Sequence, residues 1–198
     1  MGYKNLSECV NDLEKSGRLV RVDAQLDPYL ELGCVQRRVY EAGGPALLFT
    51  NVKNTKFPML GNLFGTMERT RFIFRDSIKV IEAMVKAKTS PKEALRHIPS
   101  LISAAAGAYR LFPAGSFSAP VLKNKCSLKD LPQLVSWPMD GGAFITLPLV
   151  YTEQPSSRGF RSSNLGMYRV QISGNEYEAD EAGVHYQIHR GIGIHHKE

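Results

Sequence analysis

Cysteine is scarce in this sequence, and long apolar runs are missing. Its three cysteines, Cys9, Cys34 and Cys126, are far apart and form no Cys-x-x-Cys pair. An odd number of isolated cysteines argues against a disulfide framework and a structural zinc site, so we interpret them as reduced core thiols. The N-terminus lacks the apolar core of a signal peptide, and no stretch approaches the roughly 20 apolar residues that span a membrane. We therefore expect a cytoplasmic protein without a transmembrane segment.

Runs of lysine and arginine, low-complexity segments and internal repeats are also absent. The formal net charge is +6, but the basic residues are dispersed. This distribution is compatible with a small anionic ligand and does not suggest a nucleic-acid partner. With 43% hydrophobic and 22% charged residues, the 198-residue chain has an ordinary globular composition. A chain of this length can bury roughly 70% of its unfolded surface, so it should fold around a core.

The first 112 residues predict an α/β unit. Leu6, Val10 and Leu13 recur at helical spacing, with Asn5 or Ser7 available as the cap. Other helices are expected at 30–42, at 76–88 and from 90 to about 106, where Gly, Pro and capping residues mark the ends. Short apolar runs predict strands at 19–22 and 46–49, and the segment 57–65 predicts a strand that leads into a Gly turn.

From residue 113 onward the pattern changes to short strands separated by Pro, Gly and Asp. The expected strands are 119–122, 144–152, 166–172 and 183–188. The predicted fold class is therefore α+β, with an α/β domain at 1–112 and a β-rich domain at 113–198 that resembles an incomplete barrel.

Histidines gather at the end of the chain. Four of the five lie in its last fourteen residues, at positions 185, 189, 195 and 196. If 184–189 forms a strand, His185 and His189 lie on the same face and could bind a metal. The alternative is that they are surface groups or hydrogen-bonded core groups.

The segment 158–169 begins as a polar loop and ends as a strand. Arginine side chains and backbone N–H groups at a glycine-containing turn suit a phosphate ligand. A loop held by salt bridges is the alternative.

Two blocks give these patterns a family context. Asn-Leu-Gly-Met-Tyr-Arg at 164–169, followed by Val-His-Tyr-Gln-Ile-His-Arg-Gly at 184–191, resembles the UbiD family of reversible (de)carboxylases. The segments 141–150 and 44–49 also resemble strands of that family. The resemblance implies an N-terminal α/β domain followed by the first strands of a split β-barrel of the flavin-reductase type, which binds prenylated FMN with a divalent cation. Manganese is the usual cation, and K+ is a further candidate.

The resemblance also assigns site residues. Asn164 and His189 match two metal ligands, and the third, a Glu, would lie beyond residue 198. Arg169 matches the catalytic arginine that faces the substrate carboxylate, a task suited to a permanently charged, bidentate donor. Thr152 is a further candidate for approaching the cofactor. The residues expected to line or contact the cofactor are Met167, Tyr168, Arg169, His185, Tyr186, Gln187, Arg190 and Gly191.

The activity that the resemblance implies is reversible decarboxylation of an aromatic or α,β-unsaturated carboxylic acid. A flavin prenyltransferase would supply the cofactor. Nothing here matches the family's acidic proton donor, and the sequence stops within the expected barrel, so we expect the N-terminal part of such an enzyme. An unpaired barrel edge predicts a homo-oligomer. The alternatives are a non-catalytic flavin- or anion-binding module, or an assembly role.

Overall fold

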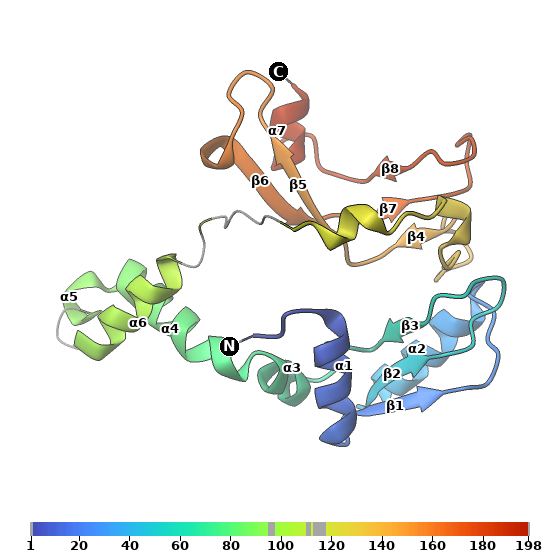
Figure 1. Ribbon diagram of the computed structural model, residues 1–198, viewed down its shortest axis with the longest axis horizontal. Helices are drawn as coiled ribbons and strands as arrows, with labels where there is room; N and C mark the ends of the chain where they lie inside the picture. The colour runs from blue at the N-terminus through green and yellow to red at the C-terminus, as the bar shows by residue number, and fades with distance from the viewer. Residues whose placement is uncertain (1, 95–97, 110–111, 113–117, 198) are drawn as a thin grey trace. The chain divides into compact units, whose positions relative to one another are not determined.

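A computed structural model describes residues 2–94, 98–109, 112 and 118–197 of the chain (Figure 1). These residues form a mixture of helices and sheets, as the predicted fold class requires. The chain divides into two compact units, and each draws on several stretches of sequence. One contains Met1–Arg21, Val39–Leu48 and Leu60–Pro120, and the other contains Val22–Arg38, Phe49–Met59 and Val121–Glu198.

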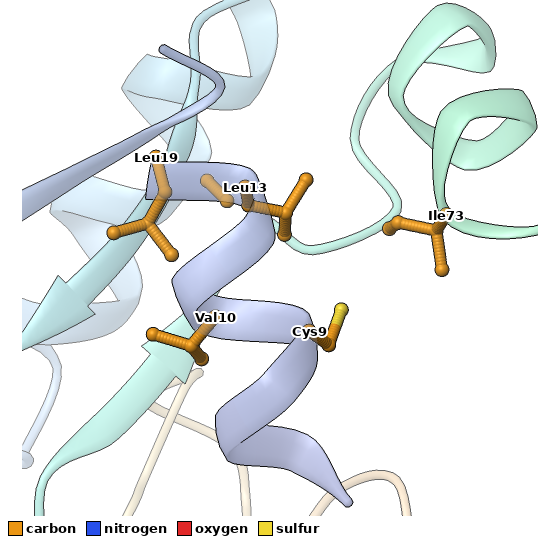
Figure 2. Packing of buried hydrophobic residues seen from close by; sticks show 6 residues of the cluster. Cys9, Val10, Leu13, Leu19 and Ile73 are labelled. Atoms are coloured by element: carbon orange, nitrogen blue, oxygen red, sulfur yellow. The ribbon is translucent and has the colours of Figure 1, made fainter. Parts of the chain in front are cut away.

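Helix α1 (Leu6–Lys15) carries the core of the first unit. Its cap is Asn5, whose side chain accepts a hydrogen bond from the backbone N–H of Glu8 at 2.9 Å. Apolar residues at helical spacing then place one face of α1 against strand β1 (Leu19–Val22) and helix α3 (Met67–Ile73). Figure 2 shows this cluster, whose labelled members are Cys9, Val10, Leu13, Leu19 and Ile73. The predicted helix and strand are confirmed.

The cysteines only partly follow the prediction. All three are free thiols, and burial raises the pKa of the Cys9 thiol, as expected of a core residue. Cys34 is half-buried, and Cys126 is exposed. The interpretation as core thiols is therefore wrong for Cys126, which lies in a polar stretch between two short 3-10 turns, Pro120–Lys123 and Leu128–Asp130.

A three-stranded sheet has the order β1-β2-β3. Strand β2 (Ala46–Phe49) matches its predicted bounds and is almost wholly buried, because a continuous apolar run suits a central strand. Helix α2 (Glu31–Glu41) precedes it, as predicted. The strand and the Gly turn predicted within 57–65 are both present: strand β3 (Met59–Gly61) begins after Pro58, which cannot donate to a ladder, and a turn follows in which the backbone N–H of Gly65 donates to the carbonyl of Asn62.

Helix α3 (Met67–Ile73) was not predicted, although Thr66 caps it through a hydrogen bond from the backbone N–H of Arg69. Arg69 is 4% exposed and donates to the carbonyl oxygens of Gly44, Asn62 and Leu63. Desolvation by burial lowers the pKa of its guanidinium. A buried arginine thus satisfies irregular backbone in two places, just before β2 and between β3 and α3.

The remaining helices of the first unit are α4 (Arg75–Thr89), α5 (Pro91–Ala94) and α6 (Ile98–Tyr109). Helix α4 confirms the helix predicted at 76–88. Helices α5 and α6 occupy much of the one predicted from residue 90, but 95–97 lie outside the described residues. Within the described part of the chain, no helix has the length and apolar character needed to cross a membrane.

The strands of the second unit form two small sheets. Strand β4 (Phe144–Ile145) pairs antiparallel with β7 (Val170–Gln171), which pairs antiparallel with β8 (Gly183–Val184). Strand β5 (Leu149–Glu153) pairs antiparallel with β6 (Ser163–Met167), and helix α7 (Ile192–His196) packs against β5 (Figure 1). The described residues form no closed barrel, so that detail of the predicted fold stays a prediction.

Several predicted strands differ from those observed. The expected strand 144–152 is two strands in different sheets, and Pro148, which has no N–H to donate to a ladder, lies in the segment between them. The expected strand 166–172 divides between β6 and β7, and 183–188 ends at Val184. The segment 119–122 is not a strand: Pro120–Lys123 forms a 3-10 turn, since proline fixes the backbone in a turn-compatible conformation.

Candidate functional site

A hollow of about 490 Å³ lies in the second unit. This volume is within the range of small-molecule sites. The stretch from β6 to β7 and the stretch after β8 form its lining, and the two are joined by a hydrogen bond from the backbone N–H of His185 to the carbonyl of Arg169 at 3.1 Å. The lining includes all of the predicted cofactor residues except Gly191: Met167, Tyr168, Arg169, His185, Tyr186, Gln187 and Arg190.

The hydroxyl of Tyr168 joins β6 to the start of α7. It accepts a hydrogen bond from Asn164 Nδ2 at 3.0 Å and another from the backbone N–H of Ile192 at 3.4 Å. The backbone N–H of Tyr168 donates to the carbonyl of Pro148 at 3.4 Å, which ties its chain to the β5 side of the hairpin. One side chain of the hollow is therefore fixed at both its backbone and its hydroxyl.

Gly191 packs against the Tyr168 hydroxyl although it does not line the hollow. We call this contact between Tyr168, Asn164 and the start of α7 the Tyr168 corner. Its φ is +54°, and a Cβ added there would lie 2.2 Å from the Tyr168 hydroxyl oxygen. A side chain at position 191 would therefore meet both backbone strain and a direct clash. Gly166 makes room for the same residue, since a Cβ there would lie 2.7 Å from the Tyr168 ring. The two glycines let the Tyr168 side chain pack closely against both segments.

Arg169 extends from the hollow wall over a buried aromatic ring. Its guanidinium carbon lies 3.8 Å from the centre of the Phe144 ring, a cation–π contact. Its Nη2 also lies 3.4 Å from Oδ1 of Asp140. The other oxygen of Asp140 accepts the backbone N–H of Trp137 at 3.1 Å, so a tight turn orients the carboxylate. Because the Arg169 side chain is about half exposed (47%), some of its donors can reach a ligand.

His185 contacts the same buried ring and a buried amide. Its imidazole meets the Phe144 ring edge to face with the centres 5.1 Å apart. Its Nε2 lies 3.0 Å from Oε1 of Gln171, which is 1% exposed. The β4–β7 register explains this grouping, because Phe144 is paired directly with Gln171.

The predicted pairing of His185 and His189 on one strand face is wrong. Strand β8 ends at Val184, and His189 lies in a turn beyond it. Nδ1 of His189 is 3.4 Å from the ammonium of Lys197, and both residues are exposed. An ammonium can only donate, so it competes for that nitrogen with any cation.

The described residues therefore fit a metal only in part. Among them, no three His, Cys, Asp or Glu side chains gather as ligands. Asn164 and His189 offer one amide and one imidazole, fewer donors than a divalent cation normally takes. The flavin fits better, because the hollow combines sufficient volume with two arginines, two tyrosines and a histidine.

The other two histidines of the C-terminal cluster, His195 and His196, lie on α7. Nδ1 of His195 is 2.9 Å from the hydroxyl of Thr152 on β5, and Nδ1 of His196 is 2.6 Å from the hydroxyl of Tyr186. They thus have hydrogen-bond partners, as the alternative interpretation of the histidine cluster expected. The contact places Thr152, a weaker cofactor candidate, beneath α7 and outside the lining of the hollow.

The glycine turn at 158–162 has an acidic neighbour. Glu153 accepts hydrogen bonds from the Tyr151 hydroxyl at 2.7 Å and from the backbone N–H of Gly159 at 3.1 Å. These bonds, in that order, lower the pKa of the Glu153 carboxyl. A carboxylate already uses the Gly159 donor, which favours a side-chain-anchored loop over a phosphate site at this turn.

Two family models match the chain one after the other. The 3-octaprenyl-4-hydroxybenzoate carboxy-lyase N-terminal domain matches residues 10–88, and the Rift-related domain of the same carboxy-lyase matches residues 114–198. The chain belongs to the UbiD family. The family resemblance of the two sequence blocks is thereby confirmed.

Relatives of this UbiD-family chain are considerably longer. A protein of Chlamydia pneumoniae, named as one of the subunits of 4-hydroxybenzoate decarboxylase, is 42% identical over 188 residues, which cover 90% of this chain and 30% of that protein. A protein of Chlamydia caviae is 41% identical over 199 residues, which cover 98% of this chain and 33% of that protein. The chain thus spans about a third of the length of these curated relatives.

Solved structures share the fold of this UbiD-family chain. The vanillic acid decarboxylase of Sedimentibacter hydroxybenzoicus in closed form matches 98% of this chain and 40% of its own, with a TM-score of 0.74 and 21% identity. An evolved dimeric form of the UbiD-class enzyme HmfF from Pelotomaculum thermopropionicum, in complex with prFMN, matches 93% of this chain and 39% of its own, with a TM-score of 0.65 and 22% identity. At these identities the likeness establishes the fold alone.

Three residues of the site escaped the sequence prediction: Asp140, Phe144 and Gln171. The only signal for Phe144 was its apolar strand, and nothing marked Asp140 or Gln171. Their importance depends on antiparallel pairing and a turn, which bring separate segments of the UbiD domain together.

Proposed function

We propose that this chain is the N-terminal part of a UbiD-type carboxy-lyase, which reversibly decarboxylates an aromatic or α,β-unsaturated carboxylic acid with prenylated FMN. The observation that carries the proposal is the hollow of about 490 Å³, which gathers residues from the two family blocks. Family membership supports the reaction class, and the prFMN complex of HmfF supports the cofactor.

The residues of the hollow suit a flavin. Tyr168 and Tyr186 offer aromatic surface, and Met167 offers a polarisable apolar one. Arg190 offers a cationic donor for the phosphate end of the flavin, and we propose that Gly191 contacts the same end. When bound, prenylated FMN would supply the electron sink that allows CO2 to leave the acid. The protein's part is to position the acid and to neutralise its charge.

We assign Arg169 the role of holding the substrate carboxylate. Its guanidinium rests on the Phe144 ring and meets Asp140 through Nη2, so the side chain is oriented before a ligand arrives. Its remaining N–H groups can bind a carboxylate, for which the planar fork gives a bidentate geometry. Asp140 offsets part of the positive charge in the ligand-free site.

Proton delivery is assigned elsewhere. Among the described residues that line the hollow there is no carboxyl group. We therefore propose that an acidic side chain outside this lining protonates the product. The chain spans about a third of the length of its relatives, and we propose that the rest of the enzyme provides this acidic group.

Metal binding is a separate part of the proposal. We propose Asn164 and His189 as two ligands of a divalent cation, with Mn2+ as first choice and K+ as a further cation. The metal content of the purified full chain, meaning the whole enzyme of which we propose this chain to be the N-terminal part, tests this directly. Asn164→Ala and His189→Ala should each lower bound manganese relative to wild type. Unchanged manganese content in both variants would contradict metal binding by these two residues.

The assembly and setting of the enzyme are proposed as follows. The domains divide at residues 112 and 113, and the second begins a split flavin-binding barrel. The enzyme acts in the cytoplasm as a homo-oligomer, without a nucleic-acid partner, and receives its cofactor from a flavin prenyltransferase. The exposed apolar residues on one face of the β5–β6 hairpin support association, since such a face favours a covering partner: Leu149, Tyr151 and Leu165.

Reconstitution tests the function. The full chain, loaded with prenylated FMN and Mn2+, is incubated with a panel of aromatic and α,β-unsaturated acids while CO2 is measured. Release of CO2 that depends on flavin supports the carboxy-lyase. Flavin absorbance without CO2 from any acid would favour the non-catalytic binding module, and the absence of both would favour an assembly role.

A further inference from the structure

Gln171 is the most deeply buried polar side chain near the hollow, at 1% exposed. Gln171 does not line the hollow, but its amide contacts His185, which does line it. Its Nε2 donates to the carbonyl of Ser173 at 3.1 Å, and its Oε1 accepts a hydrogen bond from Asn175 Nδ2 at 3.4 Å. The buried amide is therefore satisfied on both sides.

These contacts fix which way the amide points. A backbone carbonyl can only accept, so the NH2 group of Gln171 must face Ser173. Its oxygen must then face His185, and an oxygen of this kind can only accept. The contact of 3.0 Å consequently requires a proton on Nε2 of His185. In the neutral imidazole, Nδ1 is then an acceptor.

We propose that Gln171 is a positioning residue that holds His185 in its Nε2–H tautomer and so gives the hollow an acceptor nitrogen, Nδ1, beside the donors of Arg169. The Phe144 ring fixes the same imidazole from a second side. A site with a carboxylate-binding arginine and a neighbouring acceptor favours acids that carry a hydrogen-bond donor, such as a hydroxyl group. This last consequence rests on the proposed function, whereas the tautomer does not.

Nitrogen NMR of the full chain, labelled with 15N-histidine, measures the tautomer directly. His185 is assigned by its absence from the spectrum of His185→Phe. At a pH where histidine is neutral, wild type should show only the Nε2–H form, with a slowly exchanging Nε2 proton. In Gln171→Leu that proton should exchange roughly tenfold faster, the effect of losing one ordinary hydrogen bond.

Gln133→Leu is the matched control. Gln133 also donates through Nε2 to backbone carbonyls, those of Leu128 and Leu131, but it does not line this hollow. Its substitution should leave the His185 signals unchanged. The Nδ1–H form in wild type, a mixture of both forms, or equal exchange in wild type and Gln171→Leu would each overturn the proposal. If Gln171→Leu fails to fold, the wild-type spectrum still decides.

Turnover separates this inference from the proposed function. In the reconstituted enzyme, Gln171→Leu should lower kcat/KM more for hydroxylated acids than for matched acids without a hydroxyl, while Gln133→Leu should not discriminate. Equal losses for both acids would overturn the selectivity. A full chain without decarboxylase activity would contradict the proposed function, yet leave the NMR result standing.

Discussion

Arg169 and His185 contact the same buried ring, the guanidinium 3.8 Å from the centre of Phe144 and the imidazole 5.1 Å from it. Phe144 is 4% exposed, so its own position is fixed by the core of the second unit. One rigid aromatic thus orients a cation and an imidazole that both line the hollow. Preorganisation of this kind reduces the ordering that a ligand must impose.

Arg169→Lys keeps the charge but removes the planar fork. We expect kcat/KM of the reconstituted enzyme to fall roughly 100-fold, as when about 2–3 kcal/mol of charge-assisted hydrogen bonding is lost. Flavin affinity should change little. Arg71→Lys, an exposed position on α3, is the control and should behave as wild type. Equal activity of Arg169→Lys and wild type would contradict the carboxylate-binding role.

Tyr168→Phe tests the hydroxyl that joins β6 to α7. The amide of Asn164 and the N–H of Ile192 lose their acceptor, so the free energy of unfolding should fall by about 1–2 kcal/mol. Denaturant titration measures the change. Tyr151→Phe removes an exposed hydroxyl that bonds to Glu153 and Ser163. Because water can replace these exposed bonds, the loss should be less than about 0.5 kcal/mol. Similar losses in the two variants would argue against a special role for Tyr168.

Gly191→Ala tests the close approach at the same corner. Gly17 also has a positive φ, +70°, but nothing lies within 4 Å of an added Cβ there. Gly17→Ala should therefore cost only backbone strain, roughly 1 kcal/mol. Gly191→Ala adds a clash with the Tyr168 hydroxyl, and we expect a total of about 3 kcal/mol or more. Thermal unfolding of both variants gives the comparison, and equal shifts would mean that the corner relaxes freely.

Asp180 should make the free energy of unfolding depend on pH in the acidic range. Hydrogen bonds from the Ser127 hydroxyl and then from the backbone N–H of Leu128 lower the pKa of its carboxyl below the usual 3.8. The stabilisation is therefore fully present above pH 3.8 and is lost as pH falls through the lowered value. Asn suits the φ of +65° at this position, so Asp180→Asn removes the titration without adding strain.

The difference in unfolding free energy between wild type and Asp180→Asn isolates this carboxyl. It should be constant from pH 7 to about pH 4 and shrink at lower pH. A difference that does not vary with pH down to about 2 would show that the hydrogen bonds do not favour the ionised form.

Local patterns were sufficient for the first part of the fold. Strand β2 is a continuous apolar run, and α1 combines a capping Asn5 with three apolar residues at helical spacing, so both were predicted from the sequence. Helix α7 was not, because five residues are too few for helical periodicity to appear. The strand predicted at 183–188 is too long for a related reason. The strand-like sequence pattern continues past Val184, whereas the backbone leaves the ladder there.

The lining of the hollow, which is the candidate site, was predictable where its residues are adjacent in sequence. The blocks 164–169 and 184–191 contain the whole lining of the hollow. Asp140, Phe144 and Gln171 were missed because their roles depend on which residues pair across β4 and β7 and on a turn before β4, neither of which periodicity specifies.

A crystal structure of the full chain with FMN shows directly whether the hollow is the flavin site. The expected result is the isoalloxazine ring in the hollow between Met167 and Tyr186, with Arg190 near the phosphate end and Arg169 open to a carboxylate. Flavin bound at another place, or a hollow without flavin at saturating concentration, would contradict it.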